Sequence, residues 1–132
     1  MKGYTTRLEE QTRKNSYFRH VLYTGKHSQL VLMTLRPGEE IGAETHKTVD
    51  QFFRIETGNG VVVIDGKRHP VKDGSGIIVP AGAKHNVINT SKKSALRLYT
   101  IYSPPEHQDG VVRRTKAAAM ARPEEYDGKP TE

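Results

Sequence analysis

Cysteine and tryptophan are absent from this chain of 132 residues, and it has no long apolar run. The lack of cysteine excludes disulfides, iron–sulfur clusters and thiolate zinc sites. No stretch approaches the length of a membrane span, and the first residues form no apolar run of signal-peptide length. The sequence has neither a cysteine nor a Gly-x-Ser-x-Gly motif, which argues against a nucleophilic hydrolase. We therefore expect a cytoplasmic protein that does not associate with membranes.

Charge of one sign is not concentrated in any segment, although the formal net charge is +6. Residues 1–14 hold four basic against two acidic residues, and residues 111–132 hold five against four. A nucleic-acid-binding protein gathers its basic residues on one face, with aromatic residues among them. The scatter argues against nucleic acid and leaves a small-molecule substrate as the expected partner. A mild basic excess is equally compatible with an anionic substrate and with a neutral one.

Short extended runs separated by turn residues begin at Tyr17 and end before Pro104-Pro105, a spacing typical of an all-β sandwich or barrel. The strongest local signal is Asp65-Gly66 between two β-branched runs, which predicts a hairpin because both turn positions need a positive φ. The predicted strands cover residues 17–24, 30–35, 43–47, 51–56, 61–64, 67–71, 77–79, 85–89 and 96–102.

The two ends of the chain differ in texture from this middle part. We expect a short irregular or helical N-terminal arm over residues 1–14, a barrel over 15–110 and a C-terminal tail over 111–132. Within the tail, Thr115 is a candidate cap for a short helix that Pro123 ends. The composition of residues 124–132 predicts a loose segment.

Both faces of the last predicted strand carry large apolar side chains. Leu96, Leu98, Thr100 and Tyr102 share one face, whereas Arg97, Tyr99 and Ile101 share the other. A strand of a small barrel needs only its inner face apolar. The outer face therefore requires a cover, either the terminal arms or a second copy of the chain. We favour a homodimer.

Two of the six histidines stand out by their context. Glu44 and His46 lie at i and i+2, so on a strand they share a face, and His85 follows a glycine-bearing loop in the same way that His46 does. His20, His27 and His69 neighbour basic residues and are predicted to lie on the surface. His107 follows the Pro-Pro pair and is predicted to lie in a loop that could close over a cavity mouth.

The spacing around these histidines resembles the two conserved motifs of the cupin superfamily. Gly74, Pro80, Gly82, His85 and Asn89 match the second motif at every position. The first motif is matched in spacing by residues 38–58. The resemblance implies a double-stranded β-helix, a jelly-roll barrel, with a metal ion bound inside it.

Two positions depart from the first motif, because Glu44 replaces a histidine and Gln51 replaces a glutamate. Asp50 could supply the carboxylate in an alternative register. Asp50 and Gln51 point to opposite faces of a strand, and Gln51 inward leaves the charged Arg54 outside. The resemblance therefore implies Glu44, His46, Gln51 and His85 as ligands of a divalent transition metal, namely Fe, Mn, Ni or Zn. A metal-free cupin that binds its ligand by hydrogen bonds is the alternative.

Function is less defined than fold. The resemblance implies a metal-dependent enzyme of oxygenase or isomerase type acting on a small oxygenated metabolite, with Glu44 as a candidate base and Tyr102 or His107 reaching in from the rim. A non-catalytic module that binds or senses a sugar or metabolite is the alternative, because one fold supports many functions.

Overall fold

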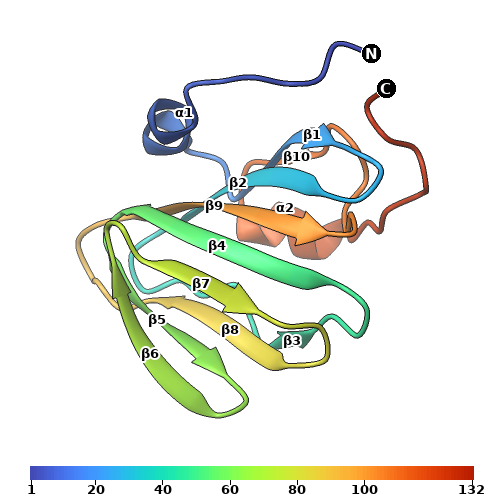
Figure 1. The fold of residues 1–132 in the computed structure, drawn as a ribbon. Helices are drawn as coiled ribbons and strands as arrows, with labels where there is room; N and C mark the ends of the chain where they lie inside the picture. Colours follow the sequence, from blue (N-terminus) through green and yellow to red (C-terminus); the bar gives the residue numbers. More distant parts are fainter.

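The computed structural model describes residues 1–132 as two facing antiparallel sheets (Figure 1). The larger sheet has the order β10-β1-β2-β9-β4-β7 and the smaller has the order β3-β8-β5-β6. The predicted jelly-roll architecture with short terminal helices is confirmed. The elements are α1 (Leu8–Lys14), β1 (Arg19–Thr24), β2 (Gln29–Leu35), β3 (Glu44–Thr45), β4 (Asp50–Thr57), β5 (Asn59–Ile64), β6 (Lys67–Lys72), β7 (Gly76–Val79), β8 (Lys84–Asn89), β9 (Leu96–Ser103), β10 (Val112–Arg113) and α2 (Lys116–Ala121).

The core lies between the sheets and is built from alternate residues of the central strands. Phe53 and Ile55 of β4 and Leu98 of β9 come from the larger sheet, and Val62 and Val87 come from the smaller one. All five are fully buried. Burial of such side chains contributes roughly 1.5–3 kcal/mol each, so the central strands supply most of the stability of the barrel.

Local turn chemistry fixes the strand pairing. Asp65 and Gly66 both have positive φ, 46° and 81°, as the predicted two-residue hairpin between β5 and β6 requires. At Gly58, φ is +95° and a Cβ atom would lie 2.5 Å from the carbonyl oxygen of Ala95. Only glycine fits there, because any side chain would displace the chain that leads into β9.

The N-terminal arm covers part of the outer face of the larger sheet. Helix α1 lies against β9 and β4, and after it Asn15 bonds with Thr34 and accepts a hydrogen bond from Arg97. Leu32 is buried on this outer face. On the same sheet, Ile78 of β7 stays 69% exposed. The arm thus accounts for some of the outer apolar surface, and the homodimer stays a prediction.

The C-terminal segment is more ordered than its composition predicts. Thr115 caps α2 as predicted, by accepting a hydrogen bond from the backbone of Ala118. The prediction of a loose segment over residues 124–132 is wrong, because Tyr126 and Thr131 donate backbone hydrogen bonds to Glu106 and Thr24. Residues 112–113 also add β10 to the edge of the larger sheet.

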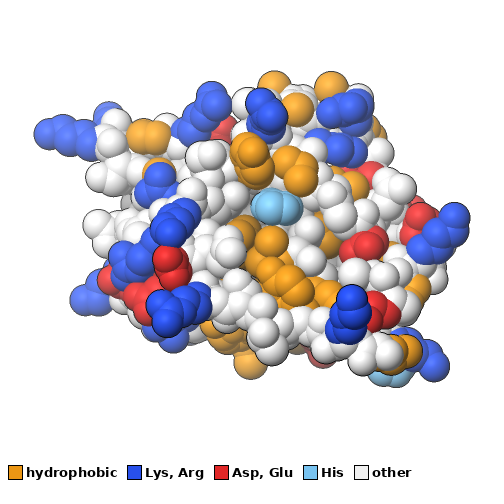
Figure 2. Space-filling view, turned by 90° about the horizontal axis from the view of Figure 1, so that it is seen from above, with side chains coloured by type: hydrophobic (Ala, Val, Ile, Leu, Met, Phe, Trp, Pro, Cys, Tyr) orange, Lys and Arg blue, Asp and Glu red, His pale blue; other side chains and the backbone are white.

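Charged side chains are mixed in sign on the surface. Figure 2 shows Lys and Arg side chains around the rim of one face, with Asp and Glu among them and apolar side chains nearer its middle. On α1, Arg13 and Lys14 pair with Glu9 and Glu10 one turn earlier. Neither helix has the length and apolarity that crossing a bilayer requires.

Candidate metal centre

Strand pairing brings the cupin-motif residues together at one end of the barrel. Glu44 on β3 lies directly opposite His85 on β8, and His46 follows β3. The loop that precedes β8 is tied to the same place by a hydrogen bond from Gly82 N to the carbonyl of His46. Gln51, at the start of β4, is paired with Tyr102 of β9. Four sequence segments therefore meet where the strands end.

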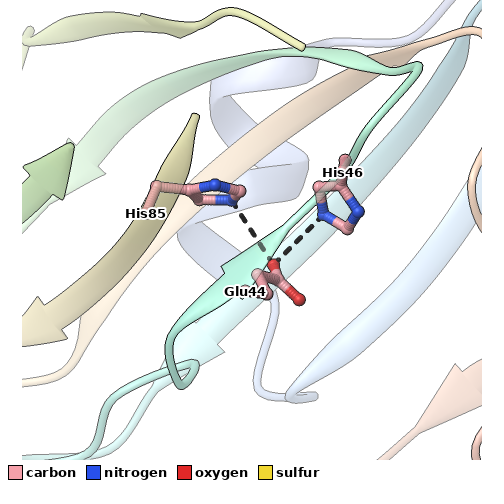
Figure 3. Close-up of side chains that lie close together, drawn as sticks. All are labelled: Glu44, His46 and His85. Atoms are coloured by element: carbon pink, nitrogen blue, oxygen red, sulfur yellow. Dashed lines mark ion pairs between the residues drawn. The ribbon is translucent and has the colours of Figure 1, made fainter. Parts of the chain in front are cut away.

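Glu44 lies between the two imidazoles (Figure 3). Its Oε1 atom is 3.3 Å from His46 Nε2 and 3.5 Å from His85 Nε2. One ligand atom from each of these three residues lies within 4.8 Å of the others. This geometry places one carboxylate and two imidazole nitrogens around a common point, which is a sufficient ligand set for a transition metal.

Three buried polar atoms in this region make no hydrogen bond, namely His46 Nε2, His85 Nε2 and Gln51 Oε1. The two nitrogens lie only at ion-pair distance from Glu44 Oε1. A buried polar atom without a partner costs on the order of 1–3 kcal/mol. All three atoms are of kinds that ligate divalent metals. The residues present therefore fit a metal ion, because coordination would satisfy the atoms that the protein leaves unpaired.

The orientation of the Gln51 amide follows from its neighbours. Thr100 Oγ1 donates its proton to the carbonyl of Phe52 at 2.8 Å, so it accepts from Gln51 Nε2 at 3.0 Å. The amide oxygen, Gln51 Oε1, therefore points away from Thr100, where it is buried and has no hydrogen-bond partner. Asp50 is exposed and accepts a hydrogen bond from the backbone of Ala81. Gln51 rather than Asp50 therefore faces inward, as strand alternation indicates.

The second nitrogen of each imidazole is already engaged. His46 Nδ1 lies 3.3 Å from Glu106 Oε1, and His85 Nδ1 lies 3.2 Å from the carbonyl oxygen of Ala83. Acceptors at Nδ1 keep a proton there, so that Nε2 offers its electron pair to a metal when the ring is neutral. This arrangement is the usual support of metal-bound histidine.

The protein polarises the site strongly without an ion. Burial alone would raise the pKa of Glu44, but the two imidazoles of His46 and His85, at ion-pair distance from its carboxylate, lower it to about 2. The nearby carboxylates of Glu106 and Glu44 raise the pKa of His46 to about 9. At neutral pH a proton on His46 thus holds together two carboxylates, and a divalent cation can replace that proton.

A pocket of about 280 Å³ leads to the site from the surface. Glu44, His46 and Glu106 line one side, and Arg19 lines it from β1. Helix α2 and the residues after it also line the pocket. The C-terminal segment is therefore part of the site and not an appendage of the barrel.

A buried hydrogen-bonded chain lies beside the metal ligands. The Tyr102 hydroxyl is 3.1 Å from His107 Nε2, and His107 Nδ1 is 3.0 Å from Glu124 Oε1. Because the Glu124 carboxylate can only accept, His107 carries its proton on Nδ1 and Nε2 accepts from Tyr102. Burial raises the pKa of Tyr102 and lowers that of His107, so both side chains are neutral at physiological pH.

The structure brings Glu44, His46 and His85 together and buries Gln51, whereas Tyr102 lies behind His107 and not on the pocket wall. His20, His27 and His69 lie away from the cluster. Sequence reasoning missed Arg19, Glu106 and Glu124. Arg19 precedes the buried Val21 by two positions, so strand alternation could have placed it on the inner face. Glu106 and Glu124 have no comparable signal.

Known proteins resemble this chain in both sequence and structure. The family model described as "Cupin domain" matches residues 31–102. The uncharacterized protein YrkC of Bacillus subtilis is 48% identical over 126 residues, which cover 91% of this chain and 67% of that protein. The crystal structure of BH2720 from Bacillus halodurans has a TM-score of 0.88 at 42% identity, covering 92% of this chain and 96% of that one. A predicted oxalate decarboxylase of Thermotoga maritima has a TM-score of 0.57 at 26% identity, covering 60% and 68%. With its motif matched across most of the barrel, the chain belongs to the cupin family.

Proposed function

We propose that this cupin is a metal-dependent enzyme for a small oxygenated metabolite, with Glu44, His46, Gln51 and His85 holding one divalent transition-metal ion. The main support is the set of three buried ligand atoms without hydrogen-bond partners. Two imidazoles and a carboxylate suit Fe, Mn, Ni or Zn. When bound, such an ion supplies Lewis-acid polarisation of substrate oxygens.

The protein's own groups prepare the site for this task. Glu106 and the carbonyl of Ala83 hold both histidines with Nε2 free, and the neutral amide of Gln51 makes the weakest of the four ligands. The pocket admits a molecule of only a few carbons beside Glu44 and His46. The site is thereby suited to a small polar substrate.

Proton transfer is assigned to Tyr102 acting through His107. Tyr102 donates to His107, and His107 donates to Glu124 on the pocket wall, so the chain can pass a proton between the buried hydroxyl and the pocket. Glu44 is the other candidate base. A carboxylate with a pKa of about 2 is a weak proton acceptor, so Glu44 serves chiefly as a ligand.

An enzyme fits these observations better than a binding module does. A sensor pocket needs hydrogen-bond partners for its ligand, but it has no need of a buried Tyr–His–Glu chain. One structural relative is a predicted oxalate decarboxylase. Metal identity then separates the two reaction types, because iron favours oxygenation whereas zinc or manganese favours isomerisation.

The first test is elemental analysis of the untagged protein by plasma mass spectrometry. We expect about one equivalent of a transition metal per chain. His46→Ala and His85→Ala should lose it while the barrel stays folded, because neither imidazole is part of the hydrophobic core.

The matched control is His27→Ala, which removes an exposed imidazole far from the cluster and should retain the metal. Wild-type protein without metal, and without uptake from added salts, would contradict the proposal. The pocket would then be one that binds its ligand by hydrogen bonds, and the protein a binding module.

The homodimer and the cytoplasmic location stay predictions. On the outer face, Phe52 pairs with Ile78 and Ile101, and its ring lies 6.3 Å from that of Tyr99. Ile78→Asp should convert the dimer to a monomer in light scattering after size exclusion. Val112→Asp, which charges an exposed apolar position on β10, should leave the dimer unchanged.

A further inference from the structure

Arg19 is an inward-facing cation at the mouth of the barrel. On β1 it shares a face with the buried Val21, and its side chain is only 13% exposed. It lines the same pocket as Glu44 and His46. A guanidinium group this enclosed requires partners for its donors, because burial removes the water that would otherwise bind them.

The protein satisfies little of that requirement. Arg19 donates one hydrogen bond, from Nη1 to Glu124 Oε1 at 3.3 Å. Its Nε atom is buried without any partner. A guanidinium group has five N–H donors in a planar fork. Four donors of Arg19 therefore have no acceptor within the protein, and the guanidinium otherwise contacts only the ring of Phe18, with Cζ 5.5 Å from the ring centroid.

Arg113 provides an internal comparison. It lies directly opposite Arg19 in the pairing of β1 with β10, binds the same carboxylate and is equally exposed at 13%. Arg113 nevertheless donates to the carbonyls of Val112 and Arg122 as well as to Glu124 Oε2. Arg113 suffices to anchor the C-terminal segment, so anchoring does not explain the unused donors of Arg19.

Charge balance points the same way. Two guanidinium groups share the single carboxylate of Glu124, which leaves one positive charge uncompensated. Lys116 adds a second cation to the pocket wall. Of the pocket carboxylates, Glu44 and Glu106 contact the histidines and Glu124 is shared, which leaves the exposed Glu125. Outside the histidine cluster, the three cations Arg19, Arg113 and Lys116 thus exceed the two carboxylates by one positive charge. Glu44, Glu106 and protonated His46 carry one negative charge until a divalent ion replaces the proton, and the excess then lies at Arg19 and Lys116.

We propose that Arg19 is the anion-binding group of this pocket and that the substrate is a small carboxylate held between Arg19 and the metal centre. This substrate class rests on the proposed function. A planar fork matches a carboxylate, and a pocket of about 280 Å³ suits a molecule of a few carbons. Lys116 assists as a point charge.

Calorimetric titration of the protein as purified tests the subsite, with malonate as the probe and its neutral diamide as the comparison. Malonate should bind and the diamide should not. Arg19→Gln should weaken malonate binding roughly 10- to 100-fold. Arg19→Lys keeps the charge but loses the planar pair of donors, so its malonate affinity should lie between those of the wild type and Arg19→Gln. Arg68→Gln removes the same charge from an exposed position on β6 and should bind like the wild type.

Metal content measured on every sample separates this inference from the proposed function. Arg19→Gln should keep its metal while it loses malonate. Equal malonate binding by wild type and Arg19→Gln would overturn the subsite, as would a metal-loaded wild type that binds no malonate. A metal-free protein that binds malonate through Arg19 would instead sustain the subsite and contradict the metal proposal.

Discussion

Each end of the barrel contains a buried carboxamide side chain, but only one of the two has all its hydrogen bonds. Asn89 ends β8 and Gln51 is the second residue of β4, and both residues are 1% exposed. Asn89 donates to the carbonyls of Leu35, Arg36 and Ser94 and accepts from Ser91. The oxygen of Gln51 has no partner.

That difference extends to the surroundings of each residue. Leu96 and Leu98 are fully buried at the start of β9, on the Asn89 side. Of the five buried polar atoms without a partner, four belong to Arg19, His46, Gln51 and His85, and Thr57 Oγ1 is the exception. Buried polar groups are normally satisfied. The end of the barrel at Asn89, the packed end, therefore stabilises the fold. The end at Gln51, the ligand end, keeps donors and acceptors free for ligands at a cost in stability.

The largest expected effect is at the ligand end and does not involve folding. His85→Leu replaces the imidazole with an apolar group of similar size. Metal affinity should fall by more than about 100-fold, because loss of a ligand exceeds the 10- to 100-fold effect of an outer-shell partner. The free energy of unfolding of the metal-free protein should fall by only about 1 kcal/mol, since the one hydrogen bond lost is that between Nδ1 and the carbonyl of Ala83. Metal titration and denaturant unfolding with chelator measure the two quantities.

Asn89→Ala is the matching change at the packed end. It removes four hydrogen bonds, three of them to backbone carbonyls, of which that of Arg36 keeps a second donor in the backbone N–H of Glu39. We expect a loss of about 2 kcal/mol in the free energy of unfolding, because the carbonyls of Leu35 and Ser94 lose this donor at a cost on the order of 1 kcal/mol each. Metal affinity at pH 7 should be unchanged in the folded protein. If His85→Leu destabilised the metal-free protein as much as Asn89→Ala does, the contrast between the two ends would be wrong.

Gln51 allows the ligand end to be tuned in both directions. Gln51→Ala should weaken metal binding less than the histidine variants do, because a neutral carbonyl is the weakest ligand of the set. Gln51→Glu should tighten binding by about tenfold, since a charged carboxylate replaces that carbonyl. Competitive titration with a chromophoric chelator gives both affinities. Equal losses in Gln51→Ala and His85→Ala would show that Gln51 is a stronger ligand than proposed.

Sequence reasoning succeeds where the signal is local. Asp65-Gly66, the cap at Thr115 and the inward orientation of Gln51 follow from turn chemistry, capping and strand alternation. Glu44, His46 and His85 were found together because motif spacing encodes which strands begin at the same rim. All of these features except the meeting of His85 with Glu44 and His46 depend on residues a few positions apart.

The outer part of the site depends instead on pairings between distant residues. Glu124 reaches Arg19 because β10 pairs with β1, although these two strands lie near opposite ends of the sequence. Tyr126 and Thr131 attach the C-terminal segment through backbone N–H groups, which leave no trace in side-chain composition. Composition therefore predicts a loose segment even where backbone hydrogen bonds hold the chain in place. The same applies to Glu106, whose contact with His46 depends on the path taken after β9.

The smallest expected effect concerns protons at the ligand end. The pKa of His46 is raised from 6.5 to about 9, so in metal-free protein its stabilising contribution is fully present below pH 6.5 and is lost as the pH rises toward 9. The pKa of Glu44 is lowered from 4.5 to about 2, so its contribution is present above pH 4.5 and is lost as the pH falls toward 2. Chelator-treated protein should therefore be most stable between these ranges.

The same pKa values predict the proton balance of metal binding. At pH 7, His46 is protonated in the metal-free site and must be neutral to coordinate, so binding should release about one proton. Calorimetric titration with metal in buffers of different ionisation enthalpy measures that number directly. His46→Ala, tested at higher metal concentration, should release fewer protons. A binding enthalpy independent of the buffer would show that His46 does not exchange its proton for the ion, and the free Nε2 atoms at this end of the barrel would then require a different ligand.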